Sequence, residues 1–283
     1  MGQGILTQMR LFLAKVKLIT SIFNTFAKIN ISKIRNLKLK INTIDAAQVQ
    51  KVALITGTGS GIGKATAELL LKEGYLVFGY SRTNKINHPN FTFTSIDLSD
   101  LTQANDLNLP IINSNTVLLI NNAATIGSIV PFDKKDTSDI INEYNLNLIS
   151  PSILCKKFIT NYTDQEKLLI NIGSGAANSP ISSWSTYCAT KAALDMLTQV
   201  IAEENHKDLR VLSVHPGIVD TNMQKTIRGT EEHLFPLLSK FTAYHSKNEL
   251  ETTTIAAQKL YYIIQNSNEF TKNILSIRDV NLK

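Results

Sequence analysis

The stretch Val52-Ala-Leu-Ile-Thr-Gly-Thr-Gly-Ser-Gly-Ile-Gly63 decides the fold of this chain of 283 residues. Its first residues form a short apolar run typical of a buried strand. Four glycines at alternate positions follow, and Lys64 to Glu73 then has the apolar spacing of an amphipathic helix that Gly74 ends. This order predicts a dinucleotide-binding turn, because glycines permit a close backbone approach and free N–H groups at a helix start suit a pyrophosphate.

The spacing of these glycines differs from the common G-x-G-x-x-G pattern, since Ile62 and Lys64 stand three residues beyond Gly59 and Gly61. A glycine-rich turn by itself is weak evidence. Its place after the first strand of a regularly alternating chain makes the prediction stronger.

Apolar runs and helical stretches alternate through the rest of the chain. We predict one doubly wound parallel α/β sheet of Rossmann type, forming a single domain over residues 51–283. In such sheets ligands bind beyond the carboxyl ends of the strands. The other expected strands are Tyr75–Tyr80, Phe91–Ile96, Thr116–Ile120, Lys167–Ile172, Arg210–Val214 and Asn273–Ile277. The other expected helices are Ile140–Asn161, in one or two pieces, and Trp184–Glu204. Mainly helical material is expected over Thr221–Gln265.

The net charge of +6 is concentrated in the first 50 residues. That segment holds eight Lys or Arg and one acidic residue, whereas the remainder holds 21 basic and 22 acidic residues. The basic balance therefore gives no support for a nucleic-acid-binding domain. Two cysteines, Cys155 and Cys188, form neither a metal-binding spacing nor a disulfide framework, so we expect a reducing compartment, the cytoplasm, and no metal site.

Residues 1–50 read differently from the rest, as a basic extension rich in Ile, Leu, Lys and Asn. Three interpretations stay open for it: an organelle targeting segment, a helix that lies on a membrane surface, and a disordered extension. No apolar run in it reaches the ~18 residues that a spanning helix needs.

The second expected strand ends in Tyr80-Ser81-Arg82. In dinucleotide folds an acidic residue near this point binds the ribose 2′-OH of NAD, whereas an arginine accommodates the 2′-phosphate of NADP. Here an arginine is present and an acid is absent, and a guanidinium matches phosphate geometry. We therefore predict NADP(H), with a surface arginine as the alternative.

Ser174, Tyr187 and Lys191 are the candidate reactive groups. Tyr187 and Lys191 stand four residues apart and share one face of a helix. A phenol has a pKa of about 10 in isolation, and a neighbouring cation lowers it. A serine hydroxyl held nearby can fix a substrate oxygen. By themselves, Tyr and Lys at this spacing are also a common helix pair, so the glycine turn and Arg82 decide between the two interpretations.

These motifs together resemble the short-chain dehydrogenase/reductase family from Lys51 to the C-terminus. The resemblance rests on Thr56–Gly63 (TGxxxGIG), Asn121–Ala124 (NNAG with Ala at the last position), Ser174 thirteen residues before Tyr187, Tyr187–Lys191 (YxxxK) and Pro216-Gly217 (PG). The segments Asn145–Pro151 and Pro216–Gln224 look most like the sepiapterin reductase and benzil reductase branch.

The resemblance implies a proton-transfer site. Tyr187 would be the general acid, and Lys191 would bind the nicotinamide ribose and lower the pKa of the tyrosine. Ser174 would bind the carbonyl oxygen, and Asn147 would support a water chain to the lysine. Asn145 is the competing choice, but Leu-Ile-Ser-Pro follows Asn147 in the order typical of the family.

The resemblance also implies the cofactor-binding residues. Asp97 and Leu98 would flank the adenine, Asn121 and Ala123 would line the dinucleotide, and Thr221 would meet the carboxamide. The full predicted set is Thr56, Gly57, Gly59, Ser60, Gly61, Ile62, Gly63, Ser81, Arg82, Asp97, Leu98, Asn121, Ala123, Tyr187, Lys191, Pro216, Gly217, Val219 and Thr221. His215 beside the PG turn is interpreted as structural.

The expected function is reduction of a small ketone or dicarbonyl with NADP(H). The alternative is a non-catalytic NADP(H) sensor or scaffold on the same fold. Residues 222–247 are expected to set substrate choice, with Phe235 and Phe241 as either pocket walls or parts of a lid packed on the core. Family members are commonly dimers or tetramers, which implies a homo-oligomer here.

Overall fold

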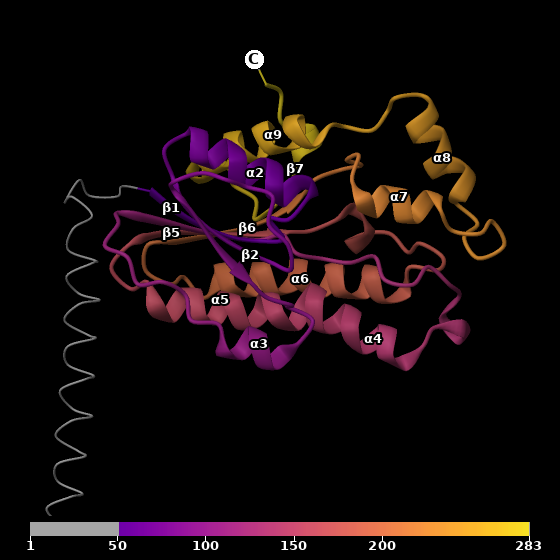
Figure 1. Ribbon diagram of the computed structural model, residues 1–283, viewed down its shortest axis with the longest axis horizontal. Coiled ribbons are helices and arrows are strands. Elements are labelled where there is room, and N and C mark those ends of the chain that lie inside the picture. Colours follow the sequence, from indigo (N-terminus) through magenta and orange to yellow (C-terminus); the bar gives the residue numbers. More distant parts are fainter. Residues whose placement is uncertain (1–50, 283) are drawn as a thin grey trace, which may run out of the picture. The chain divides into compact units, whose positions relative to one another are not determined.

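The computed structural model describes residues 51–282, and these residues are built on one seven-stranded parallel sheet with helices on both faces (Figure 1). The strand order is β3-β2-β1-β4-β5-β6-β7, and every neighbouring pair is parallel. The order reverses between β1 and β4, which is where a doubly wound sheet binds its ligand. The predicted fold class is confirmed. The strands are β1 (Lys51–Thr56), β2 (Leu76–Ser81), β3 (Phe91–Ser95), β4 (Thr116–Asn121), β5 (Glu166–Ile172), β6 (Leu209–His215) and β7 (Ile274–Ser276).

Two hydrophobic layers cover the sheet. Successive strand residues point to opposite faces, so in β1 Ala53 and Ile55 join one layer while Val52 and Leu54 join the other. The first layer packs under α2 (Gly61–Lys72) and α9 (Thr253–Gln265), and the second under α3 (Leu101–Asp106), α5 (Ser150–Asn161) and α6 (Ser185–Glu203) (Figure 1). Because both faces are covered, the strands read as continuous apolar runs.

The long helical stretch that the sequence predicts over Ile140–Asn161 consists of three pieces. α4 (Thr137–Tyr144) and α5 are joined by a π-helical turn, Asn145–Ile149. α3 is a short helix that the sequence analysis did not predict, and the carboxylate of Asp100 starts it by accepting from two backbone N–H groups. After β6, the chain forms α7 (Asn222–Arg228) and α8 (Leu238–Ser246) beyond the carboxyl edge of the sheet (Figure 1).

The basic segment, residues 1–50, lies outside the described residues, so the three interpretations of it and the domain boundary at residue 50 stay predictions. Within residues 51–282, no helix has the length and apolar character that crossing a membrane requires.

Candidate active site

The glycine turn lies between β1 and α2 and leaves no room for larger residues. Gly57 and Gly61 have φ angles of 75° and 61°, in the left-handed region that favours glycine. A Cβ on Gly59 would lie 2.6 Å from Thr83 Oγ1, and one on Gly63 would collide with Asn122 and the Gly57 carbonyl. The backbone thus runs close against its neighbours and leaves space outside the turn.

The amino-terminal end of α2 is prepared for an anion. Its N-cap, Ser60, makes no side-chain cap hydrogen bond, and the first turn contains no acidic residue. The free N–H groups and the positive end of the helix dipole therefore face outward without a partner from the side chains of this helix. A pyrophosphate would satisfy both.

A cavity of about 350 Å³ opens beside this turn at the reversal of the strand order. Its lining combines the glycine turn, the ends of β2 and β3 and the segment after β4, as expected for an adenosine site. The lining residues are Gly57, Gly59, Ser60, Tyr80, Ser81, Arg82, Thr83, Ile96, Asp97, Leu98, Ala123, Ala124 and Leu146. Eight of the predicted cofactor residues are among them, so this part of the chain fits a dinucleotide.

Arg82 and Asp97 give this cavity its charge. Two hydrogen bonds from Ser99, one from its backbone N–H and one from its hydroxyl, lower the pKa of Asp97, and the charge of Arg82 lowers it further. Asp97 is therefore an anion near neutral pH. The guanidinium of Arg82 is exposed and makes no ion pair within 4 Å among the described residues, which leaves it able to meet a phosphate.

The structure places Asn121 and Asn122 differently from the expectation. Asn121 is buried, and its Nδ2 donates to Asn171 Oδ1 at 2.9 Å, so its side chain lies in the core and not in the cavity lining. Asn122, which the sequence analysis did not single out, donates from Nδ2 to the Thr56 carbonyl at 2.9 Å. Thr56 in turn accepts from the backbone N–H groups of Asn122 and Ala123. The second Asn of the motif thus braces the glycine turn.

The PG turn after β6 reaches the glycine turn from the other side. Gly217 has a φ of 69°, and Thr221 lies so that a Cβ on Gly61 would contact its methyl group at 3.5 Å. Thr221 is therefore beside the glycine turn. Val219, by contrast, is 4% exposed and belongs to the hydrophobic layer under α2 and α9, and Ile62 packs against that layer as well. Both predicted residues support the turn from the core side.

Tyr187 lies on the first turn of α6 and is almost fully buried. Burial raises its pKa, and a hydrogen bond with Ser174 partly opposes that rise. Burial therefore outweighs the lowering that the sequence led us to expect from Lys191. Ser174 caps a short 3-10 turn after β5 by accepting from the Ala176 N–H at 3.1 Å, so its own hydroxyl hydrogen is free to donate. The phenol of Tyr187, a potential acid, is thus paired with the hydroxyl of Ser174, a hydrogen-bond donor.

Lys191 lies one turn further along α6, beneath the tyrosine. Its Nζ donates to the Ile172 carbonyl at 2.7 Å and is 5.8 Å from the centre of the Tyr187 ring. Burial lowers the pKa of Lys191 to about 8, and the charge of Asp195 acts in the opposite sense. The ammonium is consequently present at neutral pH and is lost at moderately alkaline pH.

Of the two candidate asparagines, Asn147 is the one that contacts α6, the helix of Tyr187 and Lys191. It is 1% exposed and bonds to both backbone groups of Thr125, accepting from its N–H at 2.8 Å and donating to its carbonyl at 2.9 Å. Its Nδ2 is also 3.4 Å from the hydroxyl of Thr190, the residue before Lys191. Asn145 donates to the Ser99 carbonyl at 3.1 Å and so contacts the segment after β3 instead.

A buried ion pair next to the tyrosine was missed by sequence reasoning. Lys135 Nζ is 2.7 Å from Glu143 Oε1, and both side chains are nearly inaccessible. Glu143 also accepts a hydrogen bond from Thr186, the residue before Tyr187. Thr186 is 43 residues from Glu143 in the chain, so no local pattern could have indicated that this ion pair lies beside the tyrosine.

An aromatic cluster closes the site on the side of α7 and α8. The ring of Trp184 stacks on Phe235 with centroids 5.4 Å apart, tilts against Phe241 at 5.2 Å and meets Tyr187 edge-on at 5.7 Å. Ser183, at a φ of 68°, donates to the Leu234 carbonyl at 2.6 Å. Phe235 and Phe241 are buried here, as the lid interpretation predicts.

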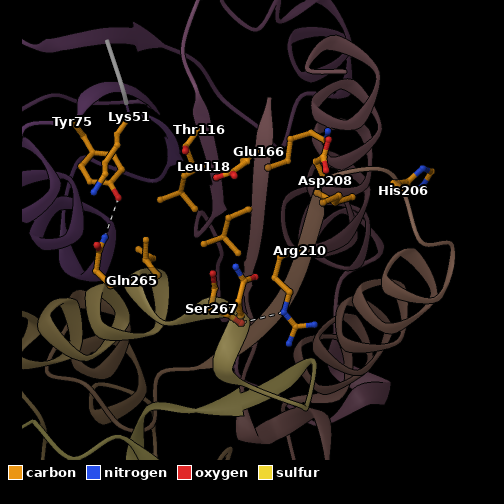
Figure 2. A pocket seen from close by; sticks show the side chains of 15 residues that line it. Lys51, Tyr75, Thr116, Leu118, Glu166, His206, Asp208, Arg210, Gln265 and Ser267 are labelled. Atoms are coloured by element: carbon orange, nitrogen blue, oxygen red, sulfur yellow. Dashed lines mark hydrogen bonds between the residues drawn. The ribbon is translucent and has the colours of Figure 1, made fainter. Parts of the chain in front are cut away.

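Figure 2 shows a second hollow at the opposite, amino-terminal edge of the sheet, lined by the first residues of β4, β5 and β6. Gln265 donates to the Tyr75 hydroxyl at 3.1 Å, and Arg210 Nε donates to the Ser267 carbonyl at 3.2 Å. These bonds tie the end of α9 to the sheet. Because the hollow lies at the other ends of the strands, we assign it no part in the candidate site.

Comparisons with known proteins agree with this geometry. The sequence model of the short chain dehydrogenase family matches residues 51–232. A benzil reductase ((S)-benzoin forming) of Bacillus cereus is 33% identical over 234 residues, covering 76% of this chain and 94% of the relative. The sepiapterin reductase of Bos taurus is 39% identical over 156 residues, covering 53% of this chain and 57% of the relative.

Solved structures share the fold at lower identity. A short chain dehydrogenase/reductase of Saccharomyces cerevisiae aligns with a TM-score of 0.68 and 22% identity, covering 81% of this chain and 96% of that one. Related structures of this fold include complexes with NADH and with NADP.

The chain belongs to the short chain dehydrogenase family, and it is an oxidoreductase of that family. A nicotinamide dinucleotide, NAD(H) or NADP(H), is the cofactor of the family, and the glycine turn and its cavity fit one. Among residues 51–282, no group of three or more His, Cys, Asp or Glu side chains is placed to hold a metal ion.

Proposed function

We propose that this chain is an NADP(H)-dependent carbonyl reductase that converts a ketone or dicarbonyl of a small molecule to an alcohol. The observation that carries the proposal is the arrangement of Ser174, Tyr187 and Lys191. Tyr187 and Lys191 lie one turn apart on the buried face of α6, and Ser174, at the end of β5, is hydrogen-bonded with the Tyr187 phenol. The named activities of the benzil and sepiapterin reductases support a carbonyl substrate.

The side chains match the charge that develops during carbonyl reduction. NADP(H), when bound at the glycine turn, would supply the hydride for the carbonyl carbon. As negative charge grows on the oxygen, Tyr187 transfers its phenolic proton to that oxygen and Ser174 donates a hydrogen bond to it. Lys191 stabilises the phenolate that Tyr187 becomes, and Asn147 holds the segment after β4 against the same helix.

The apolar surroundings of Tyr187 favour a hydrophobic substrate. Its neighbours in the cluster include Ile126, Ile129, Trp184 and Met223. Aromatic and aliphatic walls bind planar apolar groups and exclude water from the transferred proton. We therefore propose an aromatic ketone or diketone as the preferred substrate class.

The preference for NADP(H) rests on Arg82. Its guanidinium is exposed at the end of the adenosine cavity, and the acid next to it in space, Asp97, lies after β3 and not at the end of β2. A 2′-phosphate would pair with the guanidinium through charge-assisted hydrogen bonds.

The experiment is NADPH oxidation with a panel of aromatic ketones and diketones, comparing the natural protein with Tyr187→Phe. Loss of the proton donor lowers kcat by about 10²- to 10⁴-fold, while NADPH affinity changes little because phenylalanine keeps the ring packing on Trp184. Cys188→Ala, one residue further along α6, is the matched control and leaves kcat near that of the natural protein.

Equal activity of the natural protein and Tyr187→Phe would refute the role of Tyr187. Normal NADPH binding with no turnover of any carbonyl would favour the sensor or scaffold, which needs the glycine turn and not the proton donor.

Two further proposals follow the family. We propose a cytoplasmic location, supported by the two free cysteines, Cys155 and Cys188, and a homo-oligomer, dimer or tetramer, as is common among members. Fractionation and a sedimentation measurement test them.

A further inference from the structure

Three polar side chains lie buried beneath the candidate site, in the contact between α6 and β6. Asp195, Ser213 and His215 are each less than 10% exposed. Asp195 Oδ1 accepts from the Ser213 hydroxyl at 2.5 Å, and Asp195 Oδ2 accepts from His215 Nε2 at 2.8 Å. Both carboxylate oxygens are therefore held by hydrogen-bond donors from β6, so neither is left without a partner in this buried place.

This carboxylate lies on the helix face of the candidate lysine. Tyr187, Lys191 and Asp195 are spaced by four residues, so they follow one another along one side of α6. The negative charge of Asp195 favours the charged form of Lys191 and opposes the larger effect of burial on its pKa, although no direct ion pair joins the two side chains. Lys191 instead donates to the Ile172 carbonyl on β5.

The adjacent backbone shows that the space around this carboxylate is fully used. A Cβ on Gly173 would lie 2.5 Å from Ser213 Oγ, 2.6 Å from His215 Cδ2 and 2.8 Å from Asp195 Oδ1. Gly173 follows the carbonyl that holds Lys191 and precedes Ser174. The ends of β5 and β6 are therefore tightly packed around three features. These are the network, the Ile172 carbonyl that binds Lys191, and Ser174.

We propose that Asp195, fixed in place by Ser213 and His215, is a positioning residue whose negative charge keeps Lys191 an ammonium beneath Tyr187. The inference rests on the proposed function in one respect, that Lys191 acts as an ammonium in the reaction. His215, which the sequence analysis interpreted as structural, then has a role at the site, since it links the PG turn to the helix that carries the reactive groups.

The charged groups around the network are few. Asp195 on α6 and His215 on β6 are its own titratable members, and Lys191 lies on the same helix face as Asp195. Arg278, after β7, lies against Gly217, two residues beyond His215. Asp195 is the anion nearest to Lys191 along this helix face, so neutralising it removes the countercharge of the lysine.

The test is the titration of Lys191 in cofactor-free protein, followed by the 13Cε resonance of lysine in [13C]lysine-labelled protein and assigned by its loss in Lys191→Arg. In Asp195→Asn, which keeps the shape and hydrogen-bonding capacity, the midpoint falls by about one pH unit or more. In His215→Gln, which keeps an amide donor and the negative charge, it stays near that of the natural protein.

The pH profile of kcat/KM reports the same shift when turnover is present. The basic limb moves to lower pH in Asp195→Asn and stays in place in His215→Gln. Should Asp195→Asn fail to fold, Asp195→Ser removes the same charge with a smaller side chain and is measured in its place.

A Lys191 midpoint that is unchanged in a folded charge-removing variant overturns the inference. So does a midpoint that moves equally in Asp195→Asn and His215→Gln, because a purely structural network would make the two alike. The titration needs no turnover, so its outcome is independent of whether Tyr187→Phe upholds the proposed reductase activity.

Discussion

Tyr187 keeps its proton through the neutral range because burial disfavours the phenolate, and the hydrogen bond with Ser174 only partly offsets that effect. A general acid must hold its proton until the substrate oxygen needs it. Lys191 shows the opposite balance, since burial brings its pKa down to about 8. Near pH 7 the phenol is therefore neutral, while Lys191 is still charged although burial favours its neutral form.

Arg82 allows a test of the cofactor preference at one side chain. In Arg82→Ala, NADPH affinity falls by about ten- to a hundredfold, as expected for the loss of charge-assisted hydrogen bonds to a phosphate, whereas NADH affinity falls less than threefold. Fluorescence titration with each cofactor measures both values.

Lys85→Ala is the matched control, because Lys85 is an exposed cation of the same segment that does not line the cavity. Similar losses of NADPH affinity in the two variants would mean that Arg82 acts by general charge and not by contact. Equal losses of NADPH and NADH in Arg82→Ala would contradict the assignment of NADP(H).

Gly127 combines a left-handed backbone with a filled space. Its φ is 67°, and a Cβ would collide with the Glu143 carboxylate, which is paired with Lys135. Gly127→Ala therefore costs about 3 kcal/mol or more, since the backbone is strained and the buried pair is displaced.

Gly74 is the matched control that distinguishes backbone strain from the collision with Glu143. Its φ is 82°, and nothing lies within 4 Å of an added Cβ. Gly74→Ala is expected to cost about 1 kcal/mol from the backbone alone. Urea unfolding of both variants gives the two free energies, and equal costs would show that the collision with Glu143 is relieved without loss.

At the scale of elements, the π-helical turn between α4 and α5 determines which asparagine contacts α6. The wider turn over Asn145–Ile149 accommodates an extra residue in the helix, as such turns often do at functional sites. Asn145 consequently faces the Ser99 carbonyl, and Asn147 faces the loop after β4.

Replacing Asn147 by Ala leaves both backbone groups of Thr125 without their buried partner. We expect a loss of about 2 kcal/mol in stability and a fall in kcat of about tenfold or more, because the loop beside Tyr187 loses its anchor. Asn145→Ala removes one part-buried bond and lowers kcat less than threefold. Thermal unfolding and steady-state kinetics on the two variants check the contrast, and a larger effect of Asn145→Ala would transfer the role to that residue.

At the scale of the whole molecule, the candidate cofactor site exists only because separate βα segments meet at one edge of the sheet. The glycine turn, the end of β2 and the segment after β4 line the cavity together. A ligand that bridges them binds the folded state and not the unfolded chain, so it stabilises the fold.

NADPH at a hundred times its Kd should therefore add about 2.7 kcal/mol to stability, which corresponds to a rise of about 5–10 °C in Tm for a domain of this size. Gly63→Ala pushes a side chain into Asn122 and the Gly57 carbonyl, and it should abolish the rise. Differential scanning fluorimetry with and without NADPH measures this. A full shift in Gly63→Ala would place the pyrophosphate elsewhere.

The sequence by itself was enough for the fold, and it supplied a set of candidate site residues that stays a prediction. The strands are apolar runs of local origin, the glycine turn has a distinctive spacing, and the family motifs are short, so each can be recognised without knowing what lies beside it. The predicted strands lie within one or two residues of the observed ones. Eight residues of the adenosine cavity were named from these local patterns.

Only the tertiary structure decided which of these side chains face the ligand and how they are charged. Asn121 turned into the core and Asn122 toward the glycine turn because each hydrogen-bonds a partner about 50 or more residues away. The hydrogen bond between Thr186 and Glu143 and the network of Asp195, Ser213 and His215 also join separate elements. The pKa of a group depends on burial and on its neighbours in space, and the chain acquires both only when it folds.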